Sequence, residues 1–109
     1  PMPLGGNVVR RDLGQGVMED ITRYTKMSIE HAIANPEAAL EFAKAWGRGI
    51  DDDTNQQFVG MYVNERTIDY APEGRASIRQ FLSEGIEAGL VNSDFDVNAM
   101  AFIGAPVDA

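Results

Sequence analysis

The chain has 109 residues, of which 44% are hydrophobic and 24% are charged, a composition typical of one globular domain. Its net charge of −8 argues against nucleic acid as a partner, because a phosphate backbone needs a positive surface. The absence of cysteine excludes disulfides, thiolate metal sites and cysteine nucleophiles, and it suits a cytoplasmic location, which we expect. No apolar run approaches the roughly 20 residues that cross a bilayer, so we expect no membrane partner.

One β-strand is expected near the N-terminus, over residues 4–11. Val8 and Val9 are β-branched, and glycines lie on both sides of the run. The chain then turns at Gly14 and Gly16. A single strand leaves donors and acceptors unpaired on both edges, so its sheet partners are expected to lie elsewhere, unless the domain is an unusual helical one.

Two helices are expected next. Apolar residues recur at helical spacing from Val17 to Ile33, which predicts the first helix. Asn35 and Pro36 interrupt this pattern, because proline disfavours helical geometry in the preceding residue and suits the first turn of a new helix. Asn35 is expected to cap that second helix, which ends near Gly47.

Two further helices complete the pattern. The run Asp51–Asp53 is expected to cap the third helix, and residues 67–72 form a connection. The fourth helix runs from about Pro72 to Gly89 and has the clearest apolar stripe. The whole chain, 1–109, is interpreted as a single unit with three parts: an extended segment and turn at 1–14, a helical region at 17–90, and a tail at 91–109 that forms a short helix or an irregular docking segment.

Several residues are expected to serve packing. Gly60 and Gly85 lie inside predicted helices, where glycine costs about 1 kcal/mol relative to alanine, so each indicates a close helix crossing. A set of large side chains is expected in the core: Tyr24, Phe42, Trp46 and Met61.

The residues supply no complete catalytic or metal site. Gly14 and Gly16 lie between a strand and a helix, but Glu19 stands where a dinucleotide-binding fingerprint needs its third glycine. The run Asp51–Asp53 lacks the spacing of a calcium loop, which favours capping. His31 is the only histidine, and its place inside a helix favours a structural or exposed residue over a general base. We therefore assign no catalytic residue and no metal ligand.

Three segments nonetheless resemble a known family. They are "PMPLGGNVVRRDLG", "SIEHAIANPEAALEFAKAWGRGID" and "FVGMYVNERTIDYAPEGRASIRQFLSEGIEAGL". In this order they are similar to the 1,4-dihydroxy-6-naphthoate synthases of menaquinone biosynthesis by the futalosine pathway. The likeness runs to about Leu90 and corresponds to the C-terminal third of that family. Its most specific pieces are 3–5, 11–13, 62–64 and 69–70 with Gly74.

The resemblance implies an α/β fold of two lobes, like that of periplasmic binding proteins, with a small-molecule substrate between the lobes. The chain itself would be mostly α, one strand plus about four helices, and residues 1–14 would carry the strand that returns from the second lobe to the first. The implied reaction is that of a lyase that breaks a carbon–carbon or carbon–oxygen bond of cyclic dehypoxanthine futalosine without a redox cofactor. The family's proposed base is a histidine upstream of the matched region, so His31 does not inherit that role.

Substrate contacts are expected from Gly5, Gly6 and Asn7. The two glycines allow close backbone approach, and Asn7 offers an amide donor and acceptor. The first hypothesis is thus the C-terminal part of such a lyase, inactive alone. The alternatives are a standalone helical module that self-associates through strand 4–11, and a non-catalytic small-ligand binding protein of the same fold.

Overall fold

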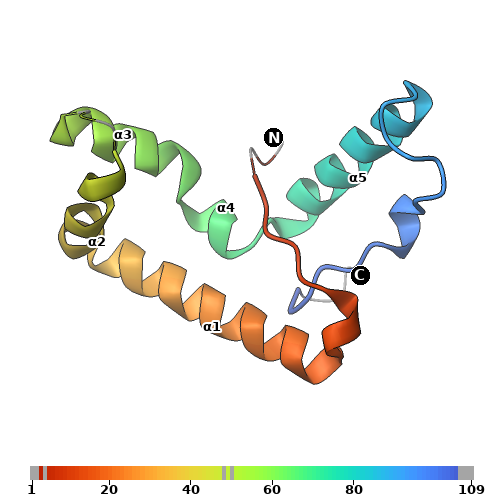
Figure 1. Ribbon diagram of the computed structural model, residues 1–109, viewed down its shortest axis with the longest axis horizontal. Helices are drawn as coiled ribbons and strands as arrows, with labels where there is room; N and C mark the ends of the chain where they lie inside the picture. Colours follow the sequence, from red (N-terminus) through yellow and green to blue (C-terminus); the bar gives the residue numbers. More distant parts are fainter. Residues whose placement is uncertain (1–2, 4, 48, 50, 106–109) are drawn as a thin grey trace.

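The computed structural model describes residues 3, 5–47, 49 and 51–105, and these are mostly helical (Figure 1). No β-strand occurs among the described residues. The helical elements follow one another in the order η1 (Arg11–Leu13), α1 (Gln15–Ala34), α2 (Pro36–Ala43), η2 (Lys44–Trp46), α3 (Asp52–Tyr62), α4 (Glu65–Ile68), α5 (Ala71–Glu87) and η3 (Val97–Ala99).

The strand expected over residues 4–11 is not formed. Residues 5–10 belong to no helix or strand, and Arg11 already begins η1, while Leu4 lies outside the described residues. A strand is defined by hydrogen bonds to a neighbouring strand, and the described chain brings none to this segment. The Val8 side chain is fully exposed. The β-strand propensity of this segment therefore leads to no strand in the described chain.

Two predicted caps have different outcomes. Asp51 caps α3 as expected, because its carboxylate accepts the backbone N–H of Thr54 at 2.9 Å. The prediction for Asn35 is wrong. Its side-chain amide donates to the carbonyl oxygen of His31 at 2.9 Å, so Asn35 closes the end of α1 and makes no side-chain cap for α2. Pro36 lacks an N–H, which leaves α2 one fewer donor to cap.

The third predicted helix is divided in two, and the predicted connection at 67–72 is partly helical. Asn64 separates α3 from α4 and forms a capping box: it accepts the N–H of Arg66 at 2.9 Å, and the hydroxyl of Thr67 accepts the N–H of Asn64 at 3.1 Å. The chain therefore changes direction at this point (Figure 1).

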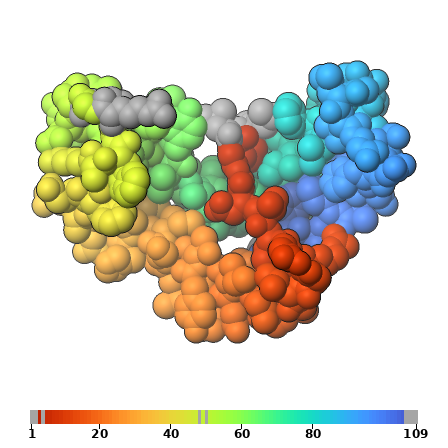
Figure 2. All heavy atoms as spheres, viewed as in Figure 1, coloured from red at the N-terminus to blue at the C-terminus, as the bar shows by residue number. Residues whose placement is uncertain are grey.

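The helices form an open arrangement, in which two groups of helices rise on either side of a long helix (Figure 1). Helix α1 lies along the base and contacts α2, α4 and η1, while α5 contacts η3. Figure 2 shows two arms, one formed by α2 and α3 and the other by α5 with the C-terminal segment, on either side of the N-terminal segment. None of the described helices is long and apolar enough to cross a membrane.

The described part of the chain contains almost no core. Its buried hydrophobic residues are Met18 on α1 and Val97 on η3. The expected core residues are exposed instead, Phe42 and Trp46 each to 77%, and Tyr24 and Met61 to more than half. These side chains have the size and spacing of core residues, but this chain has no second layer for them to pack against. Here the prediction of a core was wrong.

The two glycines predicted at helix crossings also differ. An added Cβ at Gly60 would meet no heavy atom within 4 Å, so no crossing occurs there among the described residues. At Gly85 a Cβ would lie 2.8 Å from Cγ2 of Val91. The close contact at Gly85 is thus with the chain segment that follows α5, where the N–H groups of Leu90 and Val91 both donate to the Gly85 carbonyl.

Candidate functional site

The side chain of Tyr70 is where three distant parts of the chain meet. Its hydroxyl donates to the carbonyl oxygen of Gly5 at 3.3 Å, across 65 positions of sequence. Its ring meets that of Phe102 edge to face, with 6.1 Å between the centroids. Tyr70 itself lies at the junction between α4 and α5. The N-terminal segment, the central turn and the C-terminal segment are therefore joined through one residue.

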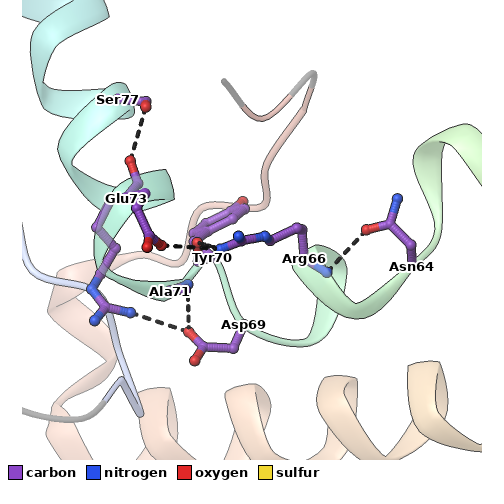
Figure 3. A network of polar contacts seen from close by, with 8 residues as sticks. Asn64, Arg66, Asp69, Tyr70, Ala71, Glu73 and Ser77 are labelled. Atoms are coloured by element: carbon purple, nitrogen blue, oxygen red, sulfur yellow. Dashed lines mark hydrogen bonds and ion pairs between the residues drawn. The ribbon is translucent and has the colours of Figure 1, made fainter. Parts of the chain in front are cut away.

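The backbone of this turn is strained at one position. Ala71 has φ +58°, a left-handed conformation that costs a residue with a Cβ roughly 1–2 kcal/mol. The carboxylate of Asp69 stabilises this conformation by accepting the Ala71 N–H at 3.1 Å (Figure 3). The same oxygen pairs with the guanidinium of Arg75 at 3.1 Å. Arg75 is almost completely buried and Asp69 is half exposed, so the ion pair lies at the edge of the packed region.

A second cation holds the turn from the other side. The Arg66 guanidinium donates to the carbonyl oxygen of Tyr70 at 3.0 Å and lies 3.4 Å from the Glu73 carboxylate (Figure 3). The backbone N–H of Glu73 and the neighbouring Arg66 lower the pKa of that carboxyl group. Glu73 therefore stays ionised beside Arg66. Arg66 thus holds the Tyr70 carbonyl, while Arg75 holds the neighbouring Asp69.

The three predicted substrate-binding residues lie along the exposed N-terminal segment, next to this turn. Gly5 accepts the Tyr70 hydrogen bond. Gly6 is so close that an added Cβ would lie 2.7 Å from the Tyr70 hydroxyl. Asn7 is exposed, and within the described chain its side chain makes no hydrogen bond, which leaves its amide available to a ligand.

The other candidates lie elsewhere. His31 is exposed near the end of α1, with Nδ1 3.5 Å from the side-chain nitrogen of Asn35. Asp51 serves its helix, because the Thr54 N–H and hydroxyl both donate to it and lower the pKa of its carboxyl group. No group of three potential metal ligands occurs among the residues that the structure describes. Neither His31 nor Asp51 contacts Tyr70 through the hydrogen bonds described here.

A shallow cavity between α2 and α3, of about 210 Å³, is a different kind of feature. Its Lys44 bridges Glu41 and Asp52 at 3.1 Å each, and these two carboxylates raise the pKa of the ammonium group. Lys44 is thus matched by these two carboxylates, whereas Glu37, which also lines the cavity, makes no ion pair with another described residue. The Lys44 bridge explains how α2 is tied to α3 and leaves no unpaired cation among the described lining residues.

Sequence reasoning missed Tyr70 as a contact of Gly5 and Gly6. The sequence does mark the turn itself, since Asp69 precedes Pro72 by three residues and such an aspartate often accepts a nearby backbone N–H. A contact between residues 5 and 70, however, depends on how four helices are placed between them. No local pattern carries that information.

Comparison with known proteins gives a consistent result. Residues 1–87 match the profile of a protein family described as "menaquinone biosynthesis". A Thermus thermophilus protein named 1,4-dihydroxy-6-naphtoate synthase is 32% identical over 90 residues, which are 83% of this chain and 33% of that protein. A Streptomyces coelicolor protein of the same name is 32% identical over 102 residues, 94% of this chain and 36% of that protein. The chain thus spans about a third of the length of these relatives. No solved structure matches it significantly.

Proposed function

The chain belongs to the menaquinone-biosynthesis family, and we propose that it is the C-terminal part of a lyase that releases 1,4-dihydroxy-6-naphthoate from cyclic dehypoxanthine futalosine. The names of the two relatives, and the order in which the three segments quoted above occur, support this reaction. The whole enzyme would work in the cytoplasm and bind its small-molecule substrate without a redox cofactor. The 109 residues alone would be inactive.

The size of the exposed surface is the observation that supports the first part of this proposal, that the chain is a piece of a larger protein. The chain exposes 8573 Å², about 1.4 times the roughly 5,900 Å² expected for a compact monomer of 11.9 kDa. Its radius of gyration is 16.4 Å, whereas a compact domain of this length has about 13 Å. The surplus surface is about three times the roughly 800 Å² that one partner buries in a standard interface. Such a surface is expected of a part that packs on a larger body.

The apolar composition of that surface also supports packing against a larger protein. Large apolar side chains are exposed on most of the described helical elements, among them Ile21 on α1, Phe42 on α2, Trp46 on η2 and Phe58 on α3. Exposed apolar surface on this scale marks an interaction site, because water disfavours it by about 25 cal/mol per Å². In the proposal, these faces cover an α/β lobe formed by the rest of the enzyme.

The extended N-terminal segment fits the same arrangement. The backbone groups of residues 6–9 make no hydrogen bond within the described chain, and Val8 is fully exposed. In a two-lobed α/β fold like that of periplasmic binding proteins, this segment would add to a sheet as the strand that returns between the lobes. Gly5, Gly6 and Asn7 would then lie at the cleft, where close backbone approach and the Asn7 amide contact the substrate. The catalytic base would come from outside these 109 residues.

The test compares two proteins: the 109 residues alone, and the longer polypeptide that the proposal requires, in which an α/β part precedes them. Each is incubated with cyclic dehypoxanthine futalosine, and 1,4-dihydroxy-6-naphthoate is measured by chromatography. We expect product only from the longer protein. Turnover by the 109 residues alone would refute the proposed division of labour, and binding without product by the longer protein would favour a ligand-binding role instead.

A further inference from the structure

The contact between Tyr70 and Gly6 has an unusual form. The backbone of Gly6 is not in the left-handed region, so an alanine could adopt its conformation. The obstacle is a single atom: an added Cβ would lie 2.7 Å from the Tyr70 hydroxyl oxygen but 3.8 Å from Cζ of the same ring. The first distance is shorter than real Cβ contacts, and the second is an ordinary van der Waals contact. An alanine at Gly6 would therefore require either the Tyr70 hydroxyl or the backbone at Gly6 to move.

The ring of Tyr70 has little freedom to move away from such a clash. An added Cβ at Gly74 would lie 3.0 Å from Cβ of Tyr70, so the base of the side chain is already tightly packed. Phe102 meets the ring edge to face, and the guanidinium of Arg79 lies 5.1 Å from the Phe102 centroid. Arg66 holds the Tyr70 carbonyl from the opposite flank. The position of the hydroxyl is thus set by α4, α5 and the C-terminal segment together.

We infer that Tyr70 is a positioning residue, whose fixed hydroxyl sets the path of the backbone at Gly5–Asn7 and thereby the placement of the groups that contact the substrate. This inference rests on the proposed function only for its last step. The hydroxyl anchors the segment through the Gly5 carbonyl, and its oxygen occupies the space beside Gly6. The adjacent Asn7 is left free to face a ligand.

The experiment is a double-mutant cycle in the longer, active polypeptide, with Gly6→Ala, Tyr70→Phe and both together. Gly6→Ala is expected to raise KM about tenfold, because displacing the segment would cost about one hydrogen bond to the substrate. Tyr70→Phe removes one neutral hydrogen bond and is expected to raise KM only about threefold. The double variant is expected to return to the level of Tyr70→Phe, because the clashing oxygen is gone. In all three, kcat should change much less than KM.

Hydrogen exchange of the peptide over residues 3–10 provides an independent readout, measured by mass spectrometry on the same proteins. Exchange should be faster in Gly6→Ala and return toward the Tyr70→Phe value in the double variant. Gly16→Ala is the matched control: Gly16 lies in α1, and an added Cβ there meets nothing within 4 Å, so neither readout should change.

The outcomes separate the two proposals. Rescue in both readouts supports the inference. The inference is overturned if Gly6→Ala changes neither KM nor exchange, or if the double variant has the same KM and exchange as Gly6→Ala alone. It is also overturned if exchange is rescued while KM is unchanged in every variant. If the unmutated polypeptide makes no naphthoate, the proposed function fails, while the exchange cycle still decides whether Tyr70 positions the segment.

Discussion

Two glycines inside helices, Gly60 on α3 and Gly85 on α5, should respond in opposite ways to the same substitution. At Gly60, alanine adds a methyl group that meets nothing, so the helix gains the difference in propensity, about 1 kcal/mol. At Gly85 the same gain is opposed by the 2.8 Å approach to Val91, a β-branched side chain with little rotational freedom. Overpacking of this kind costs about 1–3 kcal/mol, so a net loss of up to about 2 kcal/mol is expected.

The assay is native-state hydrogen exchange, because it reports local stability in a chain with so small a core. Gly60→Ala should slow exchange of the α3 amides about fivefold, which corresponds to about 1 kcal/mol. Gly85→Ala should accelerate exchange of the Leu90 and Val91 amides, which donate to the Gly85 carbonyl. Adding Val91→Ala to Gly85→Ala should remove most of that acceleration, because the methyl group in the way is deleted.

Equal slowing of exchange by both single substitutions would refute this reasoning. It would mean that the segment after α5 shifts aside without cost and that helix propensity alone decides both sites. Acceleration by Gly60→Ala would contradict it in the other direction, because it would reveal a neighbour packed against α3.

Three further predictions concern the caps, the turn and the extended segment. Hydrogen bonds from Thr54 lower the pKa of the Asp51 carboxyl group in the folded chain. The stabilisation of α3 by this cap is therefore fully present above the ordinary aspartate pKa of about 3.9 and is lost as the pH falls through the lower pKa of the folded state. The chemical shift of the Thr54 amide should follow this titration, and Asp51→Ala should abolish the pH dependence. Asp69→Ala should lower the free energy of unfolding in urea by about 2 kcal/mol. This is less than the cost of breaking a fully buried ion pair, because Asp69 is half exposed. An unchanged urea midpoint would contradict the stabilising role given to the Asp69–Arg75 pair. The isolated 109 residues should form a concentration-dependent dimer through the segment 4–11 in sedimentation, and Val8→Pro should abolish it because proline lacks the pairing N–H; a dimer that survives must use another surface.

Much of the helical structure could be predicted from local chemistry. The break at Asn35 and Pro36, the cap at Asp51 and the end of α5 before Gly89 all follow from properties of one or two residues. These signals act within one turn of helix, so they do not depend on the remainder of the fold.

The failures have a common physical cause. Trp46 and Val8 carry core-like and strand-like signals, yet both are exposed. A sequence pattern indicates that a residue favours a core or a strand. Burial and strand pairing, however, require a second layer or a neighbouring strand, and the described chain contains neither for these residues. For the candidate site, substrate contact by Gly5, Gly6 and Asn7 stays a prediction, whereas the hydrogen bond between Tyr70 and Gly5 required the three-dimensional path of the chain.

The hydrogen bond between Tyr70 and Gly5 also has a consequence for the order in which the chain folds. It closes a loop of 65 positions, and the chain entropy lost in such a closure is of order 4 kcal/mol, whereas one neutral hydrogen bond offsets only about 1 kcal/mol. The contact is therefore expected to form after α1 has packed against α4, because that contact already brings the two ends of the loop closer. During synthesis Tyr70 emerges 65 positions after Gly5, so this hydrogen bond can hold the N-terminal segment only after α1 to α4 have been made.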